Sequence, residues 1–258
     1  MTVDTAREHI RVKGLEMRYG ARLIQHGLDF SVMRGDIFVI MGGSGCGKST
    51  LLKHMIGLHE PAAGEVFYNG TSYQRCDAGA RAAMRRRWGI TYQSGGLFSA
   101  MTLAENVALP LTQYTALDPQ SVREMVSYKL ALVGLAGFEE YYPSEISGGM
   151  QKRAGLARAI ALDPDILFFD EPSAGLDPVS SRLLNELILQ MREALGVTVV
   201  IVTHELASIF AIASNSVYLD AETRTMLDTG DPRELLRASP HTAVRRFLGR
   251  GETAGVSP

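Results

Sequence analysis

The stretch GGSGCGKST, residues 42–50, constrains the fold of this chain more than any other feature. It matches the pattern G-x-x-x-x-G-K-[ST], follows the apolar run Ile37–Met41 and precedes a helix expected over Ser49–Ile56. In such a loop the backbone N–H groups turn toward phosphate oxygens, and the dipole of the following helix adds to the attraction. We therefore expect a strand, a phosphate-binding loop and a helix, with Lys48 contacting the β- and γ-phosphates and Ser49 as a Mg²⁺ ligand.

Three further apolar runs have the length of strands that are buried on both faces: Ile90–Tyr92, Ile166–Phe169 and Val197–Val202. Runs of this kind are typical of a parallel sheet with helices between the strands. Each run ends in a polar residue or a glycine loop. Because ligands of open parallel sheets bind beyond the carboxyl ends of the strands, we expect the site there.

The remaining segments predict an antiparallel β portion near the N-terminus and a helical region between about residues 100 and 160. The strands are Ile10–Tyr19, Leu28–Met33 and Glu65–Asn69, and the helices are Leu103–Leu109, Pro119–Leu132 and one after Ser147. Val217–Leu219 and Thr225–Leu227 indicate a hairpin, and Asp231-Pro232 indicates a short helix. We expect one domain over residues 1–240 and a loose tail over residues 241–258.

Composition excludes several classes of protein. A net charge of −2 gives no electrostatic reason for nucleic acid as a partner, and no apolar run approaches the ~20 residues of a membrane span. The two cysteines, Cys46 and Cys76, supply neither a disulfide framework nor metal-site spacing, so we expect a reducing, cytosolic setting. We interpret the basic cluster Arg81, Arg85, Arg86 and Arg87 as a solvated helix face near lipid headgroups or a partner.

Polar residues follow the other apolar runs. Asp170 is placed to hold Mg²⁺, and Glu171 to accept a proton from an attacking water. His204 follows the fourth run, where strand order would put it beside Asp170 and Glu171, and Gln93 follows the second. Taken singly, Asp170 and Glu171 would be interpreted as part of a strand-end turn. His204 would be interpreted as a surface histidine and Gln93 as a loop glutamine. Beside a phosphate loop, the catalytic reading is favoured.

A second anion site is indicated by SEISGGMQKR, residues 144–153. Ser147 can cap a helix, but Gly148 and Gly149 occupy its first turn, where each costs about 1 kcal/mol relative to alanine. A helix N-terminus without side chains suits an anion.

These motifs, in this order, resemble the ATPase family of ABC transporters over residues 10–240. The resemblance implies a P-loop NTPase core with a mainly parallel sheet, an N-terminal antiparallel β portion and an inserted helical subdomain. It also implies ATP and Mg²⁺ as ligands, with Tyr19 stacking on adenine. Asp170 and Glu171 match the Walker B aspartate and the general base, Gln93 the Q-loop glutamine and Mg²⁺ ligand, and His204 the switch histidine. The nucleotide-binding loop comprises Gly42, Gly43, Ser44, Gly45, Cys46, Gly47, Lys48, Ser49 and Thr50.

The same resemblance implies a head-to-tail dimer with two shared ATP sites. ISGGM, residues 146–150, stands at the signature motif, so Ser147, Gly148 and Gly149 would contact nucleotide held by a second copy. Asp177, in SAGLD, would face that copy. Ile146 and Met150 depart from the usual leucine and glutamine of the motif, whereas its serine and glycines are intact.

SGGLF after Gln93, together with Met150, resembles the ATPases of bacterial Mla or MCE-type lipid transport. This resemblance implies an integral-membrane permease contacted by residues 93–111, an MCE-domain protein and, in some members, a STAS-domain protein. The ATPase would lie on the cytoplasmic face of the inner membrane. The alternatives are the ATPase of a binding-protein-dependent amino-acid or ion importer and a non-transport ABC ATPase of DNA repair or translation.

Cys46 lies inside the phosphate loop at a helix N-terminus, an environment that lowers the pKa of a thiol. We expect a thiol-alkylating reagent to inhibit the ATPase and ATP to protect against it. The alternative is an inert small residue packed under the loop.

Overall fold

The computed structural model describes residues 8–250, which divide into two compact units. The first unit takes the residues up to Arg81 and those from Thr198 onward, and the second takes Ala82–Val197. Parallel strands occur in both units, and an antiparallel sheet occurs in the first, so the expected α/β class is confirmed. None of the helices described is long and apolar enough to cross a bilayer.

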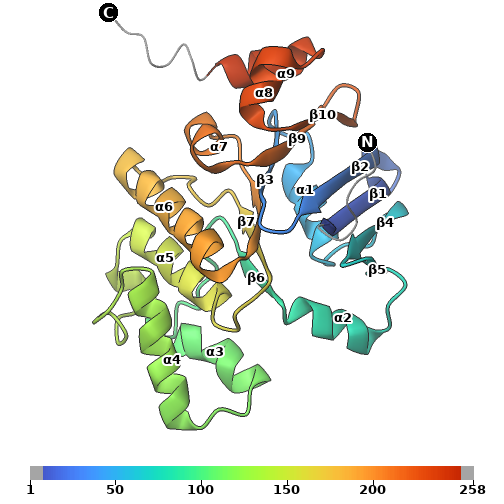
Figure 1. Ribbon diagram of the computed structural model, residues 1–258. Helices are drawn as coiled ribbons and strands as arrows, with labels where there is room; N and C mark the ends of the chain where they lie inside the picture. Colours follow the sequence, from blue (N-terminus) through green and yellow to red (C-terminus); the bar gives the residue numbers. More distant parts are fainter. Residues whose placement is uncertain (1–7, 251–258) are drawn as a thin grey trace, which may run out of the picture. The chain divides into compact units, whose positions relative to one another are not determined.

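The antiparallel sheet of the first unit has the strand order β2-β1-β4-β5 (Figure 1). Its strands are β1 (Glu8–Tyr19), β2 (Arg22–Met33), β4 (Ala63–Tyr68) and β5 (Thr71–Ser72). Tyr19 pairs with Arg22 across the tight turn between β1 and β2. Ile10 and Val12 of β1 are fully buried, and Leu15 and Met17 are fully buried beyond a register shift that follows Val12.

The other strands of the first unit lie in the order β10-β9-β3-β8. They are β3 (Ile37–Gly42), β8 (Thr198–Val202), β9 (Asn215–Leu219) and β10 (Met226–Gly230). Strand β3 runs parallel to both β8 and β9, whereas β10 closes the hairpin with β9. All six residues of β3 are buried, which explains why this stretch is continuously apolar. The carboxyl ends of β3 and β8 therefore meet at one edge.

The helices of the first unit are α1 (Lys48–Met55), α7 (Leu206–Ile212), α8 (Pro232–Ala238) and α9 (Thr242–Gly249). The expectation of a loose segment from residue 241 is wrong for α9. Val244 and Leu248 are buried, and the Phe247 ring meets the Tyr218 ring edge-on at 5.4 Å. Helix α9 is shorter than the window of about 11–18 residues over which apolar periodicity is informative. Residues 251–258 of the expected tail lie outside the described residues.

Helix α2 (Ala78–Arg85) begins in the first unit and ends in the second. The second unit contains the parallel pair β6 (Trp88–Thr91) and β7 (Ile166–Asp170). Its other elements are α3 (Leu103–Tyr114), α4 (Pro119–Leu132), a 3₁₀ turn η1 (Pro143–Glu145), α5 (Gly148–Ala159) and α6 (Pro178–Leu195). Helices α3, α4 and α5, green to yellow in Figure 1, pack on one another. They fall where the sequence predicts a helical region.

Side-chain caps explain where several of these helices begin. Thr102 and Glu105 form a capping box at α3. The Asp118 carboxylate accepts hydrogen bonds from the N–H groups of Gln120 and Ser121, and Pro119 opens α4. Asp177 and Pro178 repeat this arrangement at α6. Helices α1 and α5 differ because both begin at glycine-rich stretches: α1 has no side-chain cap, whereas the Ser147 hydroxyl caps α5.

Candidate nucleotide-binding site

The phosphate loop of the first unit leaves the carboxyl end of β3 and enters α1. The Lys48 ammonium donates hydrogen bonds to the carbonyl oxygens of Gly42 and Gly43, both at 3.0 Å. Lys48 is only 8% exposed, so its charge is held within the loop. This places a fixed cation where the sequence predicts that the β- and γ-phosphates bind.

The N-terminus of α1 is open to an anion. Its N-cap residue, Gly47, has φ of 100°, a left-handed backbone that side chains rarely adopt, and no side chain caps the helix. A Cβ at Gly43 or Gly45 would meet no atom within 4 Å, so there is space beside the loop. Backbone N–H groups, the helix dipole and the Lys48 charge together fit a phosphate chain.

His204 and Tyr19 belong to the same unit as the loop. Ile40 of β3 pairs with Val202 of β8, so the segment that carries His204 leaves the same sheet edge as the phosphate loop. Tyr19 ends β1 and is 48% exposed, and the His59 ring meets it nearly perpendicularly at 5.8 Å. Contact of Tyr19 with adenine stays a prediction.

The second unit brings Gln93, Asp170 and Glu171 to one edge. Thr91 of β6 pairs with Phe169 of β7, so these three residues follow neighbouring parallel strands. Glu171 has φ of 50°, a left-handed backbone that is uncommon outside glycine, asparagine and aspartate and costs about 1–3 kcal/mol. Strain of this kind clusters at functional sites, which agrees with a catalytic role for Glu171.

The signature stretch, residues 146–150, forms the N-terminus of α5. The Ser147 hydroxyl accepts a hydrogen bond from the Met150 N–H at 3.2 Å, so Ser147 is the N-cap, as predicted. Gly148 and Gly149 form the first turn. A Cβ at Gly149 would lie 3.2 Å from the Ser180 hydroxyl oxygen, so α5 begins close to α6.

Helix α5 also contacts the loops that carry Gln93 and Asp177, which sequence reasoning missed. The Lys152 ammonium donates to the Ala174 carbonyl oxygen in the SAGLD loop. A Cβ at Gly155 would lie 2.5 Å from the Gly95 carbonyl oxygen, so only a glycine lets the Gln93 loop approach this closely. The signal in the sequence was Gly155, a glycine in the interior of an otherwise good helix.

Asp177 is engaged within its own chain. Its carboxylate accepts hydrogen bonds from the N–H groups of Val179 and Ser180 at 2.9 and 3.0 Å and from the Ser180 hydroxyl at 2.6 Å. The bond from that hydroxyl, followed by the backbone bonds, lowers the pKa of Asp177. A role facing a second copy stays a prediction.

The predicted site residues are therefore divided between the two units. The first unit contains Tyr19, the phosphate loop and His204, and the second contains residues 93, 147–149, 170, 171 and 177. The prediction that His204 lies beside Asp170 and Glu171 links different units and stays a prediction. So does the joint binding of Mg²⁺ by Ser49, Gln93 and Asp170.

The structure contradicts the expected low pKa of Cys46. Its side chain is 1% exposed, and burial raises the pKa of the thiol even though the nearby Lys48 charge opposes this shift. Desolvation therefore outweighs the helix N-terminus, and the alternative of a packed, inert residue is favoured.

We expect alkylation of Cys46 to be slow at neutral pH and to accelerate at alkaline pH, because only the thiolate reacts. Cys76 is partly exposed and serves as the internal control. Mass-spectrometric mapping of iodoacetamide labelling at the two pH values measures both sites. Equal labelling rates for Cys46 and Cys76 at neutral pH would contradict this account.

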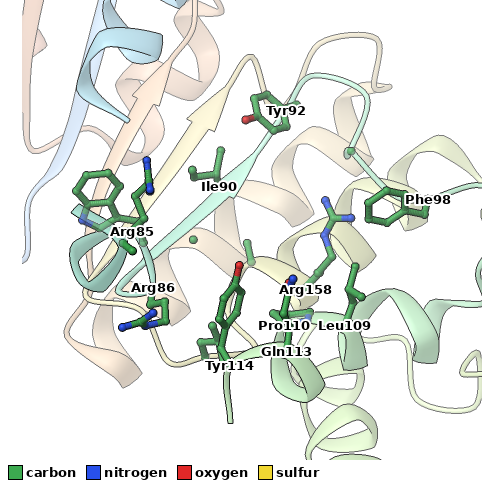
Figure 2. A pocket seen from close by; sticks show the side chains of 16 residues that line it. Arg85, Arg86, Ile90, Tyr92, Phe98, Leu109, Pro110, Gln113, Tyr114 and Arg158 are labelled. Atoms are coloured by element: carbon green, nitrogen blue, oxygen red, sulfur yellow. The ribbon is translucent and has the colours of Figure 1, made fainter. Parts of the chain in front are cut away.

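A groove of about 560 Å³ also lies wholly within the second unit. Figure 2 shows Ile90 of β6 and Tyr92 just after that strand, with Leu109, Pro110, Gln113 and Tyr114 of α3 on another side. Arg85, Arg86 and Arg158 line it as well, and the Arg158 guanidinium lies 5.7 Å from the centre of the Phe98 ring. The groove therefore combines aromatic surface with positive charge.

Comparisons with known proteins agree with these motifs. The family described as ABC transporter matches residues 25–174. The chain is 40% identical over 239 residues to the probable ribonucleotide transport ATP-binding protein mkl of Mycobacterium bovis, covering 93% of this chain and 66% of that relative. It is also 40% identical over 246 residues to the intermembrane phospholipid transport system ATP-binding protein MlaF of Haemophilus influenzae, covering 95% of this chain and 92% of that protein.

A solved structure of a dimeric ATP-binding cassette in a post-hydrolysis state, bound to ADP and phosphate, has a similar fold. The TM-score is 0.77 at 27% identity, and the alignment covers 86% of this chain and 98% of that one. The family match spans more than half of the chain and includes the phosphate loop, Gln93, the signature stretch, Asp170 and Glu171. This chain belongs to the ATPase family of ABC transporters.

Proposed function

We propose that this chain powers a separate permease that moves phospholipid or a related lipid across a bacterial envelope. It would act as a head-to-tail dimer at the cytoplasmic face of the inner membrane. The observation that carries this proposal is the likeness to MlaF, which extends over nearly the whole of both chains. The mkl relative is longer than this chain, and its printed role in ribonucleotide transport is the second candidate.

The chemistry would be divided between two copies. Lys48 and the N-terminus of α1 bind the triphosphate, and Glu171 accepts the proton of the attacking water, with His204 and Gln93 near the γ-phosphate. Ser147 and Gly149 of a second copy close the site with the N-terminus of α5, which suits an anion. Mg²⁺, when held by Ser49, Gln93 and Asp170, would neutralise charge on the β- and γ-phosphates.

The groove of Figure 2 is the surface that best suits the permease. Tyr92, Phe98 and Leu109 line it, and they lie in or beside the segment 93–111 that is expected to contact that partner. Three arginines on its walls favour an acidic occupant. We therefore assign it to a cytoplasmic segment of the permease that carries both apolar and acidic side chains.

Substitutions in the groove should uncouple the chain from the permease. We expect Arg86→Glu combined with Tyr114→Ala to reduce recovery of the permease complex several-fold, because both charge complementarity and aromatic contact are lost. The basal ATPase of the isolated chain should not change. Complex recovery after detergent extraction and basal turnover are the two measurements.

Tyr128→Ala is the matched control for the tyrosine of this variant. Tyr128 is also exposed, at 55% against 51% for Tyr114, but it lies on α4 and does not line the groove. Equal complex recovery for the groove variant and the wild-type chain would exclude the groove as the permease surface.

Lipid transport itself is tested with the purified complex in nanodiscs. We expect co-purified phospholipid and an MCE-domain protein, with or without a STAS-domain protein, and turnover that rises with phospholipid in the bilayer. Stimulation by a soluble binding protein with an amino acid or ion would favour the importer alternative. Stimulation by ribonucleotides other than the hydrolysed ATP would favour the role printed for mkl.

A further inference from the structure

Gln25 of β2 is a polar side chain buried beneath the phosphate loop. It is 0% exposed, and its Nε2 amide donates hydrogen bonds to the carbonyl oxygens of Cys46 at 2.7 Å and Asp220 at 2.8 Å. Both N–H groups of the amide are therefore used. One bond goes to the phosphate loop, and the other goes to the turn that follows β9.

The Asp220 end of this bridge is fixed to the rest of the unit. The Asp220 N–H donates to the Thr225 carbonyl at 2.9 Å, and the Asp220 carboxylate accepts from the N–H and hydroxyl of Thr223, both at 2.8 Å. The His26 N–H next to Gln25 donates to the Arg224 carbonyl at 2.9 Å. Strand β2 therefore makes two hydrogen bonds to the turn that follows β9. Gln25 thus connects the phosphate loop to a turn that is itself held by several hydrogen bonds.

The phosphate loop also lies close to strands β2 and β9. A Cβ at Gly42 would lie 2.3 Å from the Leu219 carbonyl oxygen, and a Cβ at Gly47 would lie 2.8 Å from the Ile24 side chain. Both ends of the loop thus lie close to neighbouring strands, Gly42 against the backbone of β9 and Gly47 against the Ile24 side chain of β2. The hydrogen bond from Gln25 to the loop goes to the Cys46 carbonyl oxygen, which belongs to the residue before Gly47, the N-cap of α1.

The direction of that carbonyl sets the direction of a phosphate-binding N–H. In a planar trans peptide the C=O and the following N–H point in opposite directions. Because Gln25 holds the Cys46 carbonyl toward β2, the Gly47 N–H points to the opposite side, away from β2. A rotated peptide would turn this donor away from the phosphate chain.

A purely structural role explains Gln25 less well. Its Oε1 is buried with no hydrogen-bond partner among the residues described, and an unsatisfied buried acceptor destabilises a protein. An apolar side chain of equal size would avoid this penalty in a core position. An apolar side chain, however, could not donate the two hydrogen bonds that Gln25 makes to the carbonyl oxygens of Cys46 and Asp220.

We infer that Gln25 is a positioning residue that presets the phosphate loop for a nucleoside triphosphate without touching it. This inference rests on the proposed binding of ATP at the loop. With the amide removed, the Cys46–Gly47 peptide is free to rotate, so the loop must be ordered when the nucleotide binds. The effect therefore falls on nucleotide affinity and only weakly on the catalytic step.

Gln25→Met tests this because methionine has similar length and volume but no N–H donor. We expect the dissociation constant for magnesium ATP and the KM to rise about tenfold, with kcat changed less than about twofold. Thr198→Val is the matched control. The Thr198 hydroxyl is bonded to the His9 ring at 2.7 Å and accepts from the Gly35 N–H at 3.0 Å, at the end of β8 away from the loop.

Both variants lose buried hydrogen bonds, and thermal unfolding measures the stability of each, but only Gln25→Met should weaken ATP binding. Gln25→Asn keeps the amide on a shorter side chain and should show a smaller loss of affinity in the same direction. Wild-type ATP affinity in either Gln25 variant that folds, or an equal loss in Thr198→Val, would overturn the inference. Failure of the wild-type chain to bind ATP would instead overturn the proposed function.

Discussion

Glu171→Gln should lower the rate of ATP hydrolysis by about 10²–10⁴-fold while ATP binding is retained. Glutamine has the size of glutamate and follows the same strand end, but its amide cannot accept the proton of an attacking water. The backbone of Glu171, with φ of 50°, is held by its surroundings and need not change. Steady-state phosphate release and equilibrium binding of ATP measure the two effects separately.

Glu186→Gln makes the same chemical change on the exposed side of α6 and is the matched control. It should leave hydrolysis and binding at wild-type values. If Glu171→Gln retained turnover within a few-fold of wild type, Glu171 would not be the general base.

Lys48→Ala should weaken ATP binding by about ten- to a hundredfold, the loss expected for a charge-assisted bond to phosphate. The variant removes a nearly buried cation whose ammonium also bonds the carbonyl oxygens of Gly42 and Gly43. Two loop carbonyls therefore lose their donor as well. Equilibrium binding of magnesium ATP measures the affinity, and thermal unfolding without nucleotide reports any loss of stability.

Lys53→Ala removes the same side chain from the last turn of α1, away from the loop. We expect it to bind ATP as the wild-type chain does. If Lys48→Ala and Lys53→Ala bound ATP equally well, the assignment of residues 42–50 as the phosphate loop would be wrong.

Local signals were sufficient where a cap or a glycine loop marked a boundary. Helix α4 spans Pro119–Leu132 as predicted, because Asp118 and Pro119 fix its start. Helix α5 begins after Ser147 for the same kind of reason. Strand β3 was recognisable because a strand buried on both faces is apolar throughout.

Features set by tertiary contacts could not be predicted. The burial of Cys46 under the loop, which reverses the direction of its pKa shift, depends on packing that no local pattern encodes. The left-handed backbone of Glu171 likewise cannot be predicted from residues 170–172, whose sequence is DEP. Gln25 is separated from Asp220 by 195 residues, so its bridge exists only in the folded chain.

Helix α6 was missed although its start carries the same Asp-Pro signal as α4. The family resemblance implies that Asp177 faces a second copy, whereas in the structure its carboxylate caps the N–H groups of Val179 and Ser180. The two roles use different features of the residue. The cap fixes the start of α6, and the loop before it remains the part expected to meet a partner.

We propose that two copies of this chain share each ATP site. Light scattering of Glu171→Gln with and without ATP tests it most directly, because slow hydrolysis preserves the nucleotide-bound state. We expect the mass of 28.1 kDa to double only when ATP is present, and Ser147→Arg in the same background to bind ATP but remain at 28.1 kDa. A monomer with saturating ATP, or a dimer that persists with Ser147→Arg, would contradict the claim.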